Sequence, residues 1–252
     1  MNRVPATPLA CVRRGVAAVL LLTAAASAPA QVWEKKEYLE WSAGDCRQIL
    51  ENSPWGTKFT LVEQRHEAFT VNPSRGTGLE SSVRLDYIAQ LRSALPIRQA
   101  VVRQLALDRK YDRMSDDDKR DFDQRAAQYL GMNFGKEIVI QIVLRTNVEI
   151  YQRQLVEYWL GVTESMVHET VYLINARGRR IAPIKYLRPS HGNPVIELVF
   201  PREHNCEPVV DGDDREFVIE LPGYNLSART AESRVLFTFK LQDLRYQGQL
   251  TF

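Results

Sequence analysis

The fold is indicated most directly by a stretch near the end of the chain, Val235-Leu236-Phe237-Thr238-Phe239-Lys240-Leu241. Apolar residues occupy its odd-numbered positions, and Thr238 and Lys240 point the other way, which is the pattern of a strand with one buried face. The same alternation recurs at Ile196, Leu198 and Phe200, and again at Phe217, Ile219 and Leu221. Several such strands separated by turns predict an antiparallel sheet structure.

The segment before these strands has the pattern of a hairpin. Residues 170–174 are β-branched and apolar, a loop with Asn175 and Gly178 follows, and residues 181–186 form a second apolar run. Pro183 donates no ladder hydrogen bond, so we expect the second strand at an edge or with a bulge. The chain closes with apolar residues at every second position from 244 to 252, which predicts a last strand.

Helices are predicted upstream of these strands. Ser42 is placed to cap a short helix, with a capping-box aspartate three residues later. Residues 82–92 alternate as a strand, Pro96 then opens a helix, and Ser115 caps a second helix with three aspartates in its first turn. We therefore expect a helical segment at about residues 96–131, between two strands.

Together these patterns predict an α+β chain that is mainly β. We expect an antiparallel immunoglobulin-like β-sandwich, with a helical hairpin inserted between strands and a short N-terminal helix. Residues 31–252 are expected to form a single compact domain that ends in a strand module at about 163–252. A chain of this length has ample apolar content for a core.

The first thirty residues have the features of a secretory signal peptide. Arg3, Arg13 and Arg14 form a basic start without any acid, residues 15–26 are apolar, and Ala28-Pro29-Ala30 supplies small residues for cleavage. The apolar stretch is too short and wrongly flanked for a spanning helix. We expect cleavage after residue 30 and a periplasmic or secreted protein; an uncleaved anchor is the alternative.

The charge balance argues against two classes of partner. The chain has 33 Lys and Arg against 31 Asp and Glu, and removing the three arginines of the leader leaves 30 basic against 31 acidic residues. A nearly neutral chain gives no electrostatic reason to bind nucleic acid or an anionic membrane. No segment after residue 30 has the length of a transmembrane helix. We expect an envelope protein or a small ligand as partner, and no cofactor.

Export makes the cysteines informative. Cys11 leaves with the leader, so Cys46 and Cys206 are the one pair that an oxidising compartment could join. A bridge closing so long a loop would stabilise the fold by up to about 5 kcal/mol. We predict this disulfide; the alternative is two separate buried thiols, because free cysteine is often buried.

Familiar catalytic motifs are missing. No Gly-x-Ser-x-Gly elbow, phosphate-binding lysine loop or Cys-x-x-Cys occurs in the sequence. His168-Glu169 begins like a zinc-protease helix, but Tyr172 stands where the second histidine is needed, and the segment reads as a strand. His191 and His204 are weak metal candidates; surface histidines are the simpler interpretation. We expect no catalytic residue and no metal.

Two groups of side chains are candidate binding residues. One is aromatic and comprises Trp41, Trp55 and Trp159. The other lies at the tip of the predicted hairpin and comprises Arg177, Arg179 and Arg180. The aromatic group could recognise a ligand, although such residues are more often core. The basic group could contact an acidic partner, with a solvated turn as the alternative.

Three segments resemble a family of uncharacterised exported bacterial proteins. They are Trp41-Ser42-x-x-Asp45-Cys46-x-x-Ile49-Leu50-x-x-Ser53-Pro54-Trp55, Ser93-Ala94-Leu95-Pro96-Ile97-Arg98-Gln99-Ala100 and Tyr246-Gln247-Gly248-x-Leu250. They cover a small part of the mature chain. The resemblance implies an exported protein with one compact unit, and it brings no activity, cofactor or catalytic residue.

From these observations we expect a non-catalytic, exported, soluble module that binds an envelope partner or a small ligand. Fold alone identifies no ligand. One alternative is a hydrolase with a non-motif active site that draws on His168, His191 or His204, since such sites are defined by geometry. Another is a structural subunit of an envelope assembly, which would present an extended apolar surface. A concave pocket where a histidine meets carboxylates would favour the enzyme.

Overall fold

The computed structural model describes residues 32–63, 82–225 and 230–252 of the chain. Residues Gln31–Phe252 group into one compact unit. The predicted signal peptide, residues 1–30, lies outside the described residues. Within the described ranges, no helix combines the length and the apolar composition that crossing a membrane requires.

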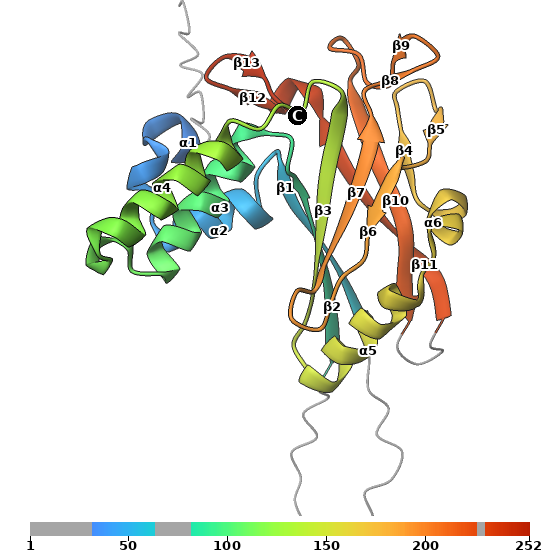
Figure 1. The fold of residues 1–252 in the computed structure, drawn as a ribbon. Helices are drawn as coiled ribbons and strands as arrows, with labels where there is room; N and C mark the ends of the chain where they lie inside the picture. The colour runs from blue at the N-terminus through green and yellow to red at the C-terminus, as the bar shows by residue number, and fades with distance from the viewer. Residues whose placement is uncertain (1–31, 64–81, 226–229) are drawn as a thin grey trace, which may run out of the picture. The chain divides into compact units, whose positions relative to one another are not determined.

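Five strands form the larger sheet, in which all neighbours are antiparallel (Figure 1). Their spatial order is β1 (Gly56–Glu63), β2 (Val83–Leu91), β3 (Glu137–Thr146), β7 (Val195–Pro201) and β6 (Lys185–Leu187). The predicted alternation sets the register: Ala89 stands opposite Ile142, which stands opposite Ile196 on its other side. All three are buried, so one face of this sheet is apolar across its centre.

A second sheet contains four antiparallel strands. Their order is β11 (Thr230–Lys240), β10 (Glu216–Asn225), β4 (Tyr172–Ile174) and β5 (Arg180–Ile181). Two short hairpins complete the described strands: β8 (Glu203–His204) with β9 (Glu207–Pro208), and β12 (Arg245–Tyr246) with β13 (Gln249–Leu250). The predicted hairpin is confirmed only in part, as β4 and the short β5. The predicted second strand, residues 181–186, is divided at Pro183, because the chain passes there from β5 in this sheet to β6 in the other.

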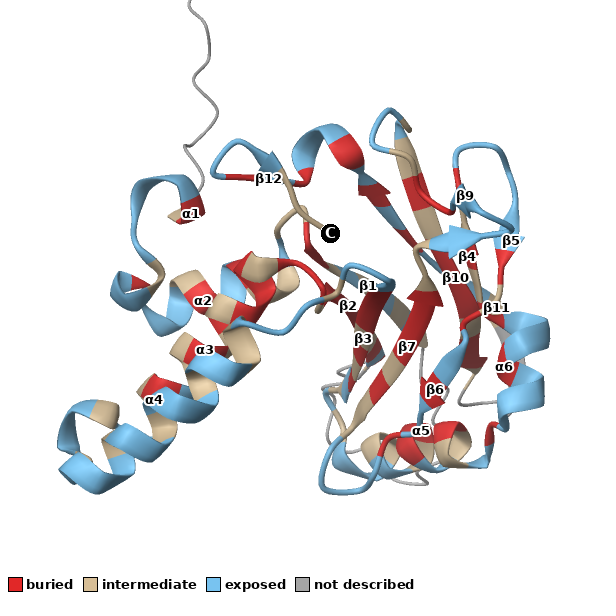
Figure 2. Ribbon diagram, turned by 45° about the horizontal axis from the view of Figure 1, so that its top comes forward, coloured by how far each residue is buried: buried red, intermediate tan, exposed pale blue. Residues whose placement is uncertain are grey.

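The main core lies between the apolar sides of the two sheets (Figure 2). The ring of Phe59 in β1 meets that of Phe237 in β11 edge-on, with centroids 6.5 Å apart. The backbone N–H of Tyr224 in β10 donates to the hydroxyl of Tyr87 in β2 at 2.9 Å. Because buried polar groups need partners, this bond contributes to the contact between the two sheets.

Six α-helices occur in the described part of the chain. They are α1 (Val32–Lys35), α2 (Ala43–Glu51), α3 (Leu95–Asp108), α4 (Asp116–Leu130), α5 (Glu149–Gly161) and α6 (Glu164–Thr170). The predicted capping box of α2 is formed by Ser42 and Asp45. Pro96 lies in the first turn of α3, and the side chain of Ser115 caps α4. These two helices are inserted between β2 and β3, as predicted, and form a helical arm beside the sheets (Figure 1).

The chain is mixed α and β, with ~36% helix and 36% strand in the described residues. The expected mainly-β class is therefore not confirmed, and neither is the immunoglobulin-like form of the sandwich. The difference comes partly from α5 and α6, which lie between β3 and β4. The interpretation of His168-Glu169 as strand is wrong, because the Thr163 side chain caps a helix there by accepting from the N–H of Met166.

The predicted last strand is instead the hairpin of β12 and β13. Gln247 and Gly248 have φ values of 50° and 78°, which form the tight turn between the two strands. The apolar alternation continues through a turn of two residues without a break in phase. For this reason period-two spacing alone did not reveal the reversal.

The predicted disulfide between Cys46 and Cys206 is absent, and both residues are free thiols. Cys46 is fully buried in α2, whereas Cys206 is exposed at the turn between β8 and β9. Figure 1 shows that these elements lie well apart. A disulfide needs Cα atoms within roughly 7 Å, so this fold does not permit the bridge.

Thiol labelling is expected to distinguish the two cysteines. In the folded protein a maleimide reagent should modify Cys206 quickly and Cys46 very slowly, because burial raises the pKa of the Cys46 thiol to about 11. Unfolding without reductant should expose both thiols to the reagent. Mass spectrometry counts the labels. If no label is found after unfolding, the disulfide forms, and Cys46 and Cys206 are not separated as described above.

Candidate functional site

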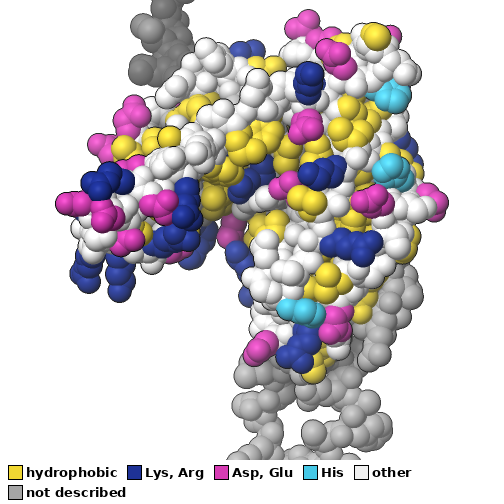
Figure 3. Space-filling view, in the orientation of Figure 1, with side chains coloured by type: hydrophobic (Ala, Val, Ile, Leu, Met, Phe, Trp, Pro, Cys, Tyr) yellow, Lys and Arg dark blue, Asp and Glu magenta, His cyan; other side chains and the backbone are white. Residues whose placement is uncertain are grey.

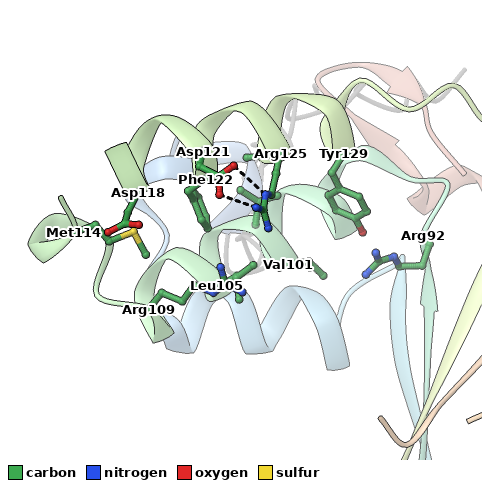
Figure 4. A pocket seen from close by; sticks show the side chains of 12 residues that line it. Arg92, Val101, Leu105, Arg109, Met114, Asp118, Asp121, Phe122, Arg125 and Tyr129 are labelled. Carbon is green, nitrogen blue, oxygen red and sulfur yellow. Dashed lines mark hydrogen bonds and ion pairs between the residues drawn. The ribbon is translucent and has the colours of Figure 1, made fainter. Parts of the chain in front are cut away.

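A groove of about 560 Å³ lies between α3 and α4. This is within the range of roughly 300–1,000 Å³ that small-molecule sites occupy. Its apolar lining consists of Val101, Val102, Leu105, Met114, Phe122 and Ala126. Its polar lining consists of Arg92, Arg109, Asp118, Asp121, Arg125 and Tyr129 (Figure 4). Figure 3 shows hydrophobic and cationic side chains together where the helical arm approaches the sheets.

The groove exists because the two helices are packed to different degrees. One side of α3 is buried, including Ile97 and Ala100, which belong to the main core. In contrast, α4 has no buried residue. Its apolar stripe at Phe122, Ala126 and Tyr129 has helical spacing and is only half-buried. The apolar stripe of an amphipathic helix is normally packed against another element. In α4 this packing is incomplete, so part of its apolar face is exposed.

Charged side chains form the rim of the groove. Arg125 forms an ion pair with Asp121 at 2.7 Å, and Asp118 accepts a hydrogen bond of 2.6 Å from the hydroxyl of Ser115. Arg109 is exposed at the end of α3 and makes no ion pair with any described residue. The rim thus has three arginines and two aspartates, and both aspartates are already engaged.

Arg92 is the least compensated charge of the groove. Its guanidinium lies 4.7 Å from the centroid of the Tyr129 ring, and no described residue forms a hydrogen bond or an ion pair with it. Burial lowers the pKa of Arg92 to about 10, an effect that Glu197 partly offsets and that Arg98 reinforces. Glu197 itself accepts a hydrogen bond of 2.7 Å from Gln141. Arg92 is therefore a charged, partly dehydrated group without a direct counter-ion.

Tyr129 brings a second unsatisfied group to the same end of the groove. Its hydroxyl is buried and has no hydrogen-bond partner among the described residues. Figure 4 shows its side chain directed toward that of Arg92. Buried hydroxyls are rarely unpaired, so this one is an available donor or acceptor beside a free guanidinium.

The structure corrects the aromatic binding patch predicted from the sequence. Trp41, Trp55 and Trp159 are all completely buried and belong to the core. The indole N–H of Trp41 donates to the carbonyl of Lys36 at 3.2 Å, and that of Trp55 to the carbonyl of Thr251 at 2.8 Å. Side chains in this position stabilise the fold and offer no surface to a partner.

The predicted basic tip exists, but its arginines have partners within the chain. Arg179 lies 3.3 Å from Glu207, and Arg177 lies 3.9 Å from both Glu207 and Asp211. Arg180 pairs with Glu220, which is almost fully buried. Intramolecular carboxylates thus already supply the acidic contacts expected from a partner.

The three histidines of the hydrolase alternative are not brought together. His168 is in α6, His204 is in β8, and both are exposed. His191 lines a depression with Glu149 and Glu157, yet no hydrogen bond or ion pair joins it to either residue in the described structure. A general base needs an orienting partner, which this arrangement does not provide. No group of three or more potential metal ligands occurs among the described residues.

The sequence contained part of the signal for the groove. The stripe at Phe122, Ala126 and Tyr129 is readable at helical spacing, but periodicity cannot show that nothing covers it. Arg92 follows a strand and belongs to no motif, so its burial depends on the tertiary fold.

Comparison with family models, with curated proteins and with solved structures found no match to the chain.

Proposed function

We propose that the protein is an exported, non-catalytic binding module whose ligand occupies the groove between α3 and α4. The observation that carries the proposal is the groove between α3 and α4. The apolar face of α4 is only partly covered there, and charged residues border it. An apolar groove with a few polar groups at its edge is the usual form of a ligand site.

The proposal includes features that the sequence predicted for the whole chain. The protein is periplasmic or secreted, and it belongs with the exported bacterial proteins that its three segments resemble. The two antiparallel sheets, with their apolar faces toward each other, support an immunoglobulin-like sandwich as the scaffold. The helical arm inserted between β2 and β3 then presents the site beside that scaffold.

Replacing Leu105 with glutamate is expected to weaken ligand binding by at least about tenfold, because it places a charge in the apolar wall. The side chain is 39% exposed in α3, and glutamate is a good helix former, so the fold should persist. The readout is the fluorescence of N-phenyl-1-naphthylamine, a neutral apolar probe, titrated with the purified protein.

The matched control is Leu236→Glu in β11, where the leucine is 48% exposed and lies outside the groove. Equal far-ultraviolet circular dichroism for both variants and the wild type establishes that each is folded. Saturable binding that is lost only in Leu105→Glu supports the proposal. If no probe binds to the wild type, or both variants bind equally well, the groove is not the ligand site.

A further inference from the structure

We propose that the ligand of the groove is a single-chain aliphatic carboxylate, with its carboxylate at Arg92 and its chain along the apolar wall. This inference rests on the proposed function, because it specifies the ligand of the same site. It is carried by charge complementarity at one end of the groove and by the extent of the apolar surface.

The uncompensated charge of Arg92 indicates an anionic head group. A guanidinium that has lost part of its hydration and lacks a counter-ion gains most from an anion placed against it. A neutral head group would gain much less, and a cationic one would be repelled. Arginine binds carboxylates through two parallel N–H donors, a geometry that suits one carboxylate at one guanidinium.

The hydroxyl of Tyr129 indicates a ligand group that accepts a hydrogen bond. It is buried without a partner, and Arg92 lies over the ring of the same tyrosine. A carboxylate held by Arg92 is therefore at the end of the groove where this hydroxyl needs an acceptor. One ligand group can satisfy both protein groups, which a hydrocarbon end cannot do.

The form of the apolar wall indicates a hydrocarbon chain. Val101, Leu105 and Phe122 lie between Arg92 at one end and Met114 at the other (Figure 4). This is the arrangement that an extended hydrocarbon chain requires. On the outward side of α4, Asp117, Arg120 and Asp123 are exposed, so the apolar surface does not continue beyond the groove. Such confined apolar surface suits a small molecule better than a protein interface, which needs about 800 Å² per partner.

Displacement of N-phenyl-1-naphthylamine measures the preference for the head group. Three ligands with the same chain are compared at neutral pH and below their micelle concentrations: dodecanoate, dodecanol and dodecyltrimethylammonium. We expect dodecanoate to bind about ten- to a hundredfold more tightly than dodecanol, the difference typical of a charge-assisted hydrogen bond. The cationic ligand should bind most weakly.

Two variants test the assigned residues. The matched control is Arg113→Gln, at an exposed arginine between α3 and α4 that does not line the groove. Arg92→Gln should reduce the preference for dodecanoate over dodecanol to about onefold. Tyr129→Phe keeps the ring beneath Arg92 and should reduce the preference severalfold. Arg113→Gln should leave it as in the wild type. The ratio of the two affinities within each variant removes general effects on folding.

The outcomes separate this inference from the proposed function. If the probe binds in the groove but dodecanol displaces it as well as dodecanoate does, the head-group assignment is wrong and the binding module remains. The same conclusion follows if Arg92→Gln retains the preference. If dodecyl phosphate binds more tightly than dodecanoate, the ligand class is a phosphate and the carboxylate is excluded. Failure of the probe to bind at all removes the proposed function itself.

Discussion

Replacing Trp55 with alanine is expected to lower the free energy of unfolding by about 3–5 kcal/mol, the usual cost of removing a large buried aromatic side chain. Trp55 is completely buried between the end of α2 and the start of β1. Its ring meets those of Trp33 and Tyr246 edge-on, at centroid distances of 5.5 and 6.2 Å. The side chain of Trp55 thus packs against residues from both the beginning and the end of the described chain.

A hydrogen bond adds to this packing. The indole N–H donates to the carbonyl of Thr251 at 2.8 Å, and the backbone carbonyl of Trp55 accepts from the N–H of Leu91 at 2.9 Å. Alanine keeps the backbone bond, but it leaves a cavity and removes the donor to Thr251. The loss therefore combines a cavity with an unpaired carbonyl.

Trp55→Phe separates the two contributions. Phenylalanine retains much of the ring volume and lacks the N–H, so it should cost about 1–3 kcal/mol, less than alanine. Denaturant unfolding followed by circular dichroism gives both values, with the midpoint shifted and the slope unchanged. If Trp55→Ala costs less than about 1 kcal/mol, the side chain lies at the surface, as the aromatic-patch hypothesis required.

The strands and helix starts were predictable because each depends on local sequence. The alternation at Phe217, Ile219 and Leu221 places three buried residues on one face of β10, as the period-two pattern predicted. The caps at Ser42 and Ser115 need only a side chain and an N–H two or three residues away. Such interactions are complete within a few residues, and tertiary contacts did not override them.

Other features depend on contacts between distant residues. Whether Trp159 is core or surface is decided by elements that lie far apart in the sequence, and the aromatic pattern is the same in both cases. The same is true of Cys46 and Cys206, whose separation is a property of the fold. The groove could not be predicted because it depends on the lack of another element packed over Phe122 and Tyr129. A sequence records no such absence.

Replacing Gly56 with alanine is expected to destabilise the protein by at least about 1–3 kcal/mol, because no space exists for a methyl group there. A Cβ at this position would lie 2.5 Å from the carbonyl oxygens of both Ile49 and Leu50. These atoms belong to the last turns of α2, where the start of β1 passes beneath the helix. Both neighbours are backbone, so a side-chain rotation cannot relieve the clash and the helix and strand must separate.

Gly44→Ala is the matched control, since it adds the same methyl group within the same helix. A Cβ there would meet the hydroxyl oxygen of Ser42 at 3.7 Å, an ordinary contact. Alanine favours helix over glycine by up to ~1 kcal/mol, so this variant should be as stable as the wild type or more stable. Thermal and denaturant unfolding of the two variants give the comparison directly. If both variants show equal stability, α2 and β1 are not in close contact. That contact places Trp55 in the core and supports α3, which forms one wall of the groove.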